Sequence, residues 1–236
     1  MTLDRSPYYA RGPLTILLRR ELAMLEPVLD GVFGVWGLHI RPHHEAPVGL
    51  PPHLLSAMSE LSLTADGTLA GHARCEPQRL PFASESFKLV VAQHVLEQMA
   101  SAEEVAGEIA RVLAPEGIAL IFGFNPVSLW RPWLSRRMPG NWQFNSASGW
   151  REVLIRSQLD TLQVRYSGLW SPWSVRDAGA NDASMRWPRA LGRFCGSWLL
   201  LARKRRSALT PLRMAAVRSD LKMKPSLVPG ARRECA

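Results

Sequence analysis

The clearest pattern in the chain is a pair of short apolar runs separated by an amphipathic segment, all between residues 80 and 124. Phe87–Val91 carries apolar residues on both faces and is too short for a helix, as is typical of a central parallel strand. Residues 102–113 repeat apolar side chains at helical spacing, at Val105, Ile109, Val112 and Leu113. Ile118–Phe122 is a second buried run. A strand, a crossover helix and a second strand predict a parallel sheet with right-handed connections.

Turn and cap residues set the limits of these elements. Ser101 followed by Glu104 predicts a capping box at the start of the helix. Pro115-Glu116-Gly117 predicts the end of that helix, and Asp66-Gly67 is a strong turn signal earlier in the chain.

Weaker patterns on both sides predict the remaining elements. Residues 13–29 carry leucines at i, i+3 and i+4 spacing after Pro13, a residue suited to the first helical position. This spacing predicts a helix that covers the sheet, with Arg19, Arg20 and Glu21 off the buried face. A basic helix lying on a membrane surface is the alternative. Apolar patterning further predicts a helix at residues 148–159 and strands at 32–40, 68–75, 162–166 and 197–202, whereas 54–64 fits either state.

Length and composition favour one α/β domain followed by a basic tail. The chain has 236 residues, of which 47% are hydrophobic, enough for a single large core. The net charge is +9, but residues 203–236 hold ten Lys and Arg against two acids, so the rest of the chain is close to neutral. We therefore expect a domain over residues 1–205 and a basic, disordered tail over 206–236. Such a tail can bind RNA or anionic lipid, or simply remain solvated, and it lacks aromatic residues for base stacking.

Three residue patterns bear on the cellular compartment, on membrane segments and on metal binding. The three cysteines are far apart and form no CxxC pair, which favours a reducing cytoplasm over a disulfide framework or a cysteine zinc site. We expect no transmembrane segment, since no apolar run approaches the roughly 20 residues that span a bilayer, and no signal peptide. Histidines are dense early in the chain, but their spacing matches no known ligand pattern, so we expect a polar loop and no metal. They are His39, His43, His44, His53 and His72.

Three segments together resemble one enzyme family. They read LPF, SFKLVVAQHVLEQM and EEVAGEIARVLAPEGIALIFGF, within residues 80–124. The sequences of these segments and their order are similar to those of the type 11 branch of the class I S-adenosylmethionine-dependent methyltransferases. Relatives in that branch include ubiquinone- and menaquinone-biosynthesis enzymes. The chain departs from the family pattern at Lys88, Gln98 and Glu116, which stand where the family has an acid, a histidine and a glycine.

The resemblance implies a Rossmann-like α/β fold. In that fold a seven-stranded, mostly parallel sheet has helices on both faces and an antiparallel last strand inserted near one edge. The resemblance also implies that S-adenosyl-L-methionine binds at the carboxyl ends of the strands. The cofactor brings the reactive methyl group, while the protein aligns donor and acceptor and excludes water.

Two elements of the family's cofactor site are altered in this chain. The glycine-rich loop after the first strand aligns with residues 39–44, which contain no glycine. His39 and Arg41 are the candidate cofactor contacts there, although each Cβ takes room that the cofactor needs, and Pro42 lacks an N–H donor. The family's second strand ends in an acid that binds the ribose, and Glu60 is a poor match for it.

Two other elements of that site are retained. Glu76 stands four residues before LPF, where the family has an acid that helps to hold the adenine, and Leu80 and Pro81 belong to the LPF segment itself. Gln93 and His94 follow the fourth strand, where the family approaches cofactor and acceptor. His94 is the candidate general base, because histidine suits proton transfer near neutral pH. A polar residue that only caps the strand end is the alternative.

Tryptophans concentrate after the fifth strand, where this fold often has a substrate lid. They are Trp130, Trp133, Trp142, Trp150, Trp170, Trp173 and Trp187. An aromatic pocket for an apolar or planar small-molecule acceptor fits this pattern, and so does ordinary packing of loops.

Three functions follow as hypotheses. The first is S-adenosylmethionine-dependent methyl transfer to a small molecule in the cytoplasm. The second is a catalytically degenerate pseudo-methyltransferase that acts as a binding or scaffold protein, suggested by the missing glycines. The third is an RNA methyltransferase that uses the basic tail.

Overall fold

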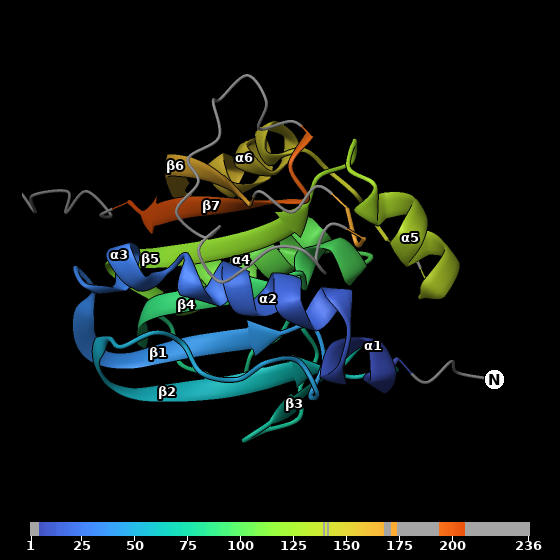
Figure 1. The fold of residues 1–236 in the computed structure, drawn as a ribbon. Helices are drawn as coiled ribbons and strands as arrows, with labels where there is room; N and C mark the ends of the chain where they lie inside the picture. The colour runs from blue at the N-terminus through green and yellow to red at the C-terminus, as the bar shows by residue number, and fades with distance from the viewer. Residues whose placement is uncertain (1–4, 139, 141, 168–170, 174–193, 206–236) are drawn as a thin grey trace, which may run out of the picture. The chain divides into compact units, whose positions relative to one another are not determined.

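Seven strands form one sheet at the centre of the computed structural model, which describes residues 5–138, 140, 142–167, 171–173 and 194–205 (Figure 1). The order across the sheet is β3-β2-β1-β4-β5-β7-β6. The strands are β1 (Phe33–Arg41), β2 (Leu54–Leu63), β3 (Leu69–Gly71), β4 (Phe87–Gln93), β5 (Leu113–Phe124), β6 (Leu159–Ser167) and β7 (Ser197–Lys204). Neighbours among β1, β2, β4 and β5 are parallel, and β7 runs antiparallel between β5 and β6. The predicted mostly parallel sheet with an antiparallel last strand is confirmed.

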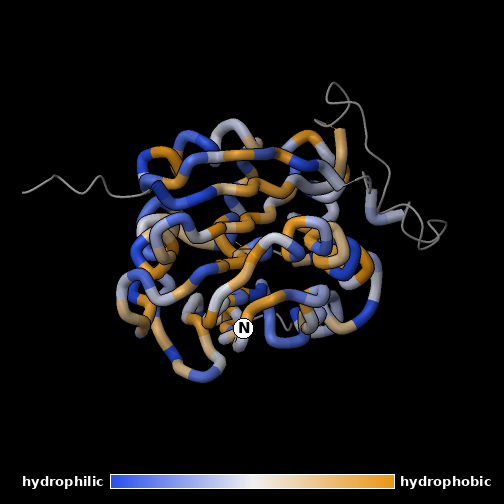
Figure 2. Tube along the Cα trace, turned by 90° about the vertical axis from the view of Figure 1, so that its left-hand side faces the viewer, coloured by the Kyte–Doolittle hydropathy of each residue, from blue (hydrophilic) through white to orange (hydrophobic). Residues whose placement is uncertain are grey.

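Helices cover both faces of this sheet. The helical segments are α1 (Ser6–Ala10), α2 (Pro13–Ala23), α3 (Glu26–Leu29), the 3₁₀ turn η1 (Leu96–Gln98), α4 (Ala102–Val112), α5 (Trp130–Arg137) and α6 (Ala147–Arg156). One face packs against α2 and α3, with Leu22 and Leu25 in one cluster with Val91 of the sheet. The other face packs against α4 and α6 through Ile109 and Trp150. The layers are therefore helix, sheet and helix, and apolar stretches run through the sheet between them (Figures 1 and 2).

A third apolar cluster lies around the carboxyl end of β5. It joins α1, the start of α2 and α5, and contains Tyr9, Leu14, Leu17, Leu18, Ala46, Phe124, Trp130, Leu134 and Met138. The leucines predicted to form the buried face of α2 are all at most 3% exposed. The predicted sheet-covering helix is confirmed, and its leucine face packs within the protein and not against a membrane.

The link between the parallel strands β1 and β2 is unusual because it contains no helix. β1 and β2 run parallel, yet residues 42–53 between them form neither a helix nor a strand, although such a crossover usually contains a helix. The ambiguous segment 54–64 forms β2. An antiparallel hairpin at Asp66-Gly67 then leads into β3, and Gly67 has a φ of 82°, in the region that favours glycine. β3 is short: it pairs with Leu61–Leu63 of β2, and its Leu69 forms an isolated bridge with Cys75.

Two local predictions at the ends of α4 are wrong. Ser101 is the N-cap residue, but its side chain accepts no capping hydrogen bond, so the capping box with Glu104 does not form. The reason is the backbone at Ser101, whose ψ of 59° departs from the extended conformation of a capping residue. The helix ends at Val112, and Leu113 already has the extended backbone that begins β5. Glu116, which replaces a family glycine, has a φ of 60°, so the chain keeps a left-handed turn without the residue that best tolerates it.

Candidate functional site

The candidate site lies where β1 and β4 end side by side beneath α2. The register pairs His39 of β1 with Val91 of β4, which brings the last residues of both strands together. The carboxamide of Gln93 donates to the backbone oxygen of Leu18 over 3.1 Å and to a carboxylate oxygen of Glu21 over 3.0 Å. Both acceptors belong to α2, so this helix is fastened to the end of β4.

His94 follows β4 directly and is held between two carboxylates. Its Nε2 lies 3.0 Å from both carboxylate oxygens of Glu21, and its Nδ1 lies 3.0 Å from Oε2 of Glu97. The other oxygen of Glu97 accepts the backbone N–H of Phe124, whose ring stacks on the imidazole at 3.9 Å between centroids. All three ionisable side chains are at most 1% exposed. We refer to them as the Glu21–His94–Glu97 cluster.

The charges in this cluster determine the protonation of His94. Burial by itself would lower the pKa of His94, but the carboxylates of Glu21 and Glu97 outweigh it and raise the pKa to about 9. Burial also raises the pKa of Glu97. The imidazole is therefore a cation at neutral pH, and both of its N–H groups donate to carboxylates. A general base must accept a proton, so in this conformation His94 positions charge, and its proposed catalytic role stays a prediction.

Glu21 is the residue that the helical pattern misplaced. The prediction that it lies off the buried face of α2 is wrong, because its side chain is fully buried. It stands four residues from both Leu17 and Leu25, which places it on the leucine face of the helix. That spacing is the signal in the sequence from which its burial follows. Glu97 carries no such signal, since nothing in HVLEQM distinguishes it from a surface acid.

Arg41 organises the loop that follows β1. Its guanidinium donates to the backbone oxygens of His44 and Ala46, over 3.1 and 2.9 Å, and pairs with Glu60 at 3.3 Å. The same loop stacks His43 on Tyr9 of α1, with ring centroids 4.9 Å apart. Residues 42–46 are thus held to the end of β1 by hydrogen bonds from Arg41, and the stacking of His43 on Tyr9 packs them against α1.

Three of the predicted cofactor-binding side chains retain unused hydrogen-bonding atoms. Both ring nitrogens of His39, Nε of Arg41 and Oε1 of Gln93 are buried without a hydrogen-bond partner among the described residues. Burial, reinforced by the charge of Arg41, lowers the pKa of His39 to about 3, so its ring is neutral. Buried polar atoms of this kind are normally satisfied by water or a ligand.

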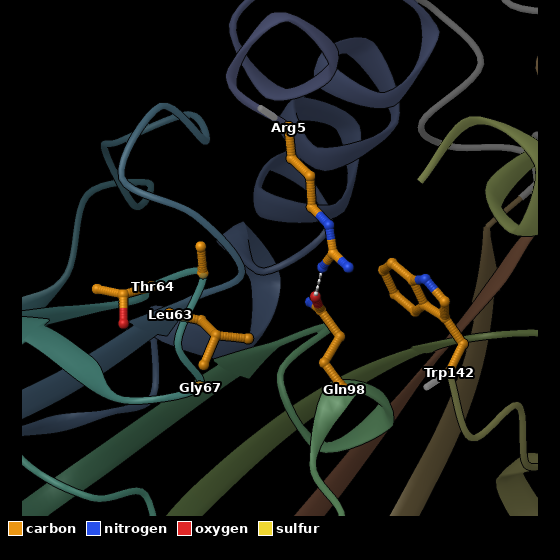
Figure 3. A pocket seen from close by; sticks show the side chains of 7 residues that line it. Arg5, Leu63, Thr64, Gly67, Gln98 and Trp142 are labelled. Atoms are coloured by element: carbon orange, nitrogen blue, oxygen red, sulfur yellow. Dashed lines mark hydrogen bonds between the residues drawn. The ribbon is translucent and has the colours of Figure 1, made fainter. Parts of the chain in front are cut away.

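A small cavity opens at the carboxyl end of β2 (Figure 3). Its volume is about 130 Å³, and its lining is Arg5, Leu63, Thr64, Ala65, Gly67, Gln98 and Trp142. Arg5 reaches across to Gln98, with its Nη1 donating to Oε1 over 3.2 Å. Sites for whole small molecules are usually about 300–1,000 Å³, so this cavity has room for only part of such a ligand. None of the residues predicted as site residues lines it.

The remaining predicted residues lie around the loop after β3. Glu76 is exposed and lines a shallow depression with Asp66, Thr68 and Glu104, among others. The backbone of Leu80 is tied to α4, because its N–H donates to Glu108 and its oxygen accepts from Arg111, both over 3.0 Å. Pro81 is exposed. The LPF segment is therefore anchored to α4, whereas His39, Arg41, Gln93 and His94 gather near α2.

The tryptophans divide between packing and the cavity. Trp130 and Trp150 are buried in two different apolar clusters, and Trp173 is 64% exposed. Trp142 stacks on Phe144 at 5.8 Å and lines the cavity. Trp170 and Trp187 lie outside the described residues.

In the part of the chain that the structure describes, no three His, Cys, Asp or Glu side chains are arranged to hold a metal ion. Nor does any helix described here have the length and apolar character needed to cross a membrane.

Comparison with known proteins agrees with this architecture. The family model for the methyltransferase domain matches residues 57–121, which run from β2 into β5. Over this part of the chain the match supports the predicted resemblance to the type 11 methyltransferases. The match begins inside β2, so β1 and the loop organised by Arg41 lie outside it. No curated protein sequence matches the chain.

Solved structures of methyltransferases share the fold at low sequence identity. An S-adenosylmethionine-dependent methyltransferase from Mesorhizobium loti is 15% identical with a TM-score of 0.55, over 78% of this chain and 98% of that one. An S-adenosylmethionine-dependent methyltransferase from Thermotoga maritima is 11% identical with a TM-score of 0.53, over 81% and 92%. Phosphoethanolamine N-methyltransferase 2 from Haemonchus contortus, solved with S-adenosyl-L-methionine, is 14% identical with a TM-score of 0.52, over 79% and 52%. These likenesses establish a shared fold.

Proposed function

We propose that the chain binds S-adenosyl-L-methionine at the carboxyl edge of the sheet and transfers its methyl group to a small-molecule acceptor. The observation that carries the proposal is the methyltransferase-domain match over residues 57–121, on strands arranged in the order of that fold. The cofactor supplies an activated methyl group, so the protein needs chiefly to orient the two reactants and keep water out.

The residues at the end of β2 fit the nucleoside part of the cofactor. Trp142 offers an aromatic face, Gln98 offers an amide, and Thr64 lies beside them in the cavity of about 130 Å³. Stacking on an aromatic ring together with hydrogen bonds to an amide is a common way to hold a nucleobase. Arg5 borders this cavity, with its guanidinium bonded to Gln98.

The end of β4 does not fit the amino-acid part of the cofactor in the described conformation. Glu21 already takes the hydrogen bonds of Gln93 and His94 there, and its carboxylate would repel a ligand carboxylate. Full undocking of α2 would expose four buried leucines, at a cost of about 8 kcal/mol, since each is worth about 2 kcal/mol. A local shift of Glu21 and of residues 42–46 is therefore the expected route to full cofactor binding.

A pseudo-methyltransferase that binds a partner without methyl transfer is the second candidate. The specific observation in its favour is the closed loop of residues 42–46, held by Arg41 where the family has glycines. The RNA methyltransferase hypothesis depends on the tail beyond residue 205, which lies outside the described residues. Salt-dependent RNA binding that requires that tail is its expected signature.

Calorimetry with S-adenosylhomocysteine separates the first two candidates. Methyl transfer predicts saturable binding to the full chain, and Trp142→Ala should weaken it at least tenfold by removing the aromatic face. Trp173→Ala is the matched control, because Trp173 is exposed and does not line the cavity. Absence of heat at millimolar ligand, with a folded protein, would leave only the pseudo-methyltransferase. Glu76→Ala tests in the same assay whether the loop after β3 contributes to adenine binding.

A further inference from the structure

The two edge strands of the sheet are protected to different degrees. On β6, Arg205 pairs with Asp160 in two hydrogen bonds of 2.6 and 2.7 Å, and Arg165 adds a second charge. The register of β6 against β7 also shifts between Thr161 and Gln163. Charges and irregular register are the usual means by which an edge avoids pairing with another chain.

The opposite edge lacks these devices. Among the described residues, β2 pairs with β3 only over Leu61–Leu63, so residues 54–60 of β2 have a strand partner on the β1 side alone. This segment reads LLSAMSE, and its one charge, Glu60, already pairs with Arg41. It contains no proline or lysine. We call residues 54–60 the open edge.

Apolar side chains surround the open edge on both faces of the sheet. Phe33 is 70% exposed, Leu54 65%, Val35 60% and Trp36 48%. The register places Phe33 beside Leu54 and Trp36 beside Ala57. Successive side chains of a strand alternate between faces, so Val35 and Trp36 point to opposite sides. Apolar surface on both sides of an unpaired strand suits the addition of a further strand, which also presents side chains to both faces.

We propose that the open edge pairs antiparallel with the same segment of a second copy of this chain, which joins two seven-stranded sheets across a two-fold axis. Antiparallel pairing of identical segments is isologous, so the edge is its own complement. Centred on Ala57, the pairing sets Glu60 opposite Leu54 of the other copy, and no like charges meet.

Charge and area both favour a second copy over a different partner. Residues 33–38 and 54–59 contain no charged residue, so a strongly basic or acidic partner finds no counterpart there. Aromatic side chains bury roughly 150–250 Å² each, so the exposed parts of the four apolar side chains amount to about 400 Å² per copy. Two copies together with the paired strands approach the roughly 1,200 Å² at which stable interfaces begin.

Sedimentation velocity on the full chain over a concentration series tests this pairing. We expect a monomer–dimer equilibrium, and Leu54→Glu should raise the dimer dissociation constant at least tenfold, because it places a glutamate opposite Glu60 of the other copy. Leu162→Glu on β6 is the matched control, as Leu162 is 49% exposed on the protected edge, and it should change the constant less than twofold. A wild-type chain that stays monomeric throughout, or equal effects of the two substitutions, would overturn the proposal.

Hydrogen exchange locates the contact independently of the variants. Backbone amides of residues 54–60 should gain protection as concentration rises through the dimer transition. Equal and high protection at concentrations where only monomer is present would mean that another part of the same chain covers the edge, and would contradict pairing between copies.

Discussion

The two halves of the carboxyl edge of the sheet are stabilised in different ways. On the side built from β4, α4 and β5, the structure keeps the family's arrangement even where residues differ: Glu116 adopts a φ of 60° in place of a glycine, and the LPF segment is tied to α4 by Glu108 and Arg111. On the side built from β1 and α2, buried charged side chains gather at the strand ends. The comparison teaches that a left-handed backbone position can be kept without glycine, whereas the loop after β1 depends on specific hydrogen bonds from Arg41.

The largest effect should come from removing the cation of the buried cluster. His94→Ala leaves Glu21 and Glu97 buried without their shared partner, and we expect a loss of about 3–5 kcal/mol in the free energy of unfolding. Urea denaturation of the full chain measures it. Glu104→Ala, an exposed acid on α4, should change stability by less than about 0.5 kcal/mol. A similar small value for His94→Ala would mean that the cluster does not hold the N-terminal half in place.

The pH dependence of stability should come next in size. The pKa of His94 is raised from 6.5 to about 9 in the folded protein. The folded state therefore holds a proton that the unfolded state releases above pH 6.5. Stability from this group is fully present below pH 6.5 and is lost as pH rises through 9, by about 3 kcal/mol in total.

NMR titration of the imidazole provides the direct check on that assignment. The His94 resonance should remain in its protonated position from pH 6 to 8, because the two carboxylates raise its pKa to about 9. A midpoint near 6.5 for His94 would show that the two carboxylates do not set its charge.

Arg41→Met should lower the stability of the fold by a smaller amount, and it should strengthen the binding of S-adenosylhomocysteine. The substitution keeps the apolar stem but removes the hydrogen bonds to His44 and Ala46 and the pair with Glu60, for a loss of about 1–3 kcal/mol. If residues 42–46 obstruct the cofactor, the same variant should bind S-adenosylhomocysteine more tightly in calorimetry. Arg74→Met, which removes the exposed pair with Asp66, is the control and should alter neither quantity measurably. Weaker binding by Arg41→Met would instead make Arg41 a cofactor contact.

The smallest effect should be a gain in stability from a substitution in β5, on the side built from β4, α4 and β5. Glu116→Gly removes a side chain from a left-handed residue and should stabilise the fold by about 0.5–1 kcal/mol, measured by thermal unfolding. The exposed pair of Glu116 with Arg203 at 3.5 Å offsets little of this. The same change at Glu103, in the first turn of α4, should destabilise by roughly 0.5–1 kcal/mol, since it adds backbone entropy and removes an acid from the helix N-terminus. Two changes of the same sign would refute the conformational explanation.

The local elements could be predicted because their causes are local. The apolar run of β4, the spacing of α4 and the Asp66-Gly67 turn each depend on neighbours within a few residues. The site could be predicted only in part. Gln93 and His94 lie at the predicted strand end, but Trp142, Arg5 and Gln98 line the cavity through contacts that bridge up to 93 positions along the chain.

The amino-acid pattern alone determined the class of fold, the order of its elements and the absence of glycines after the first strand. Tertiary structure decided what replaced them. Glu21 becomes a buried partner of His94 only because α2 packs over the end of β4, 73 residues away in sequence. The apolar pattern of a helix reports which face is buried, but it does not report which charge on another element that face will meet, and this pairing follows only from the packing of the two elements.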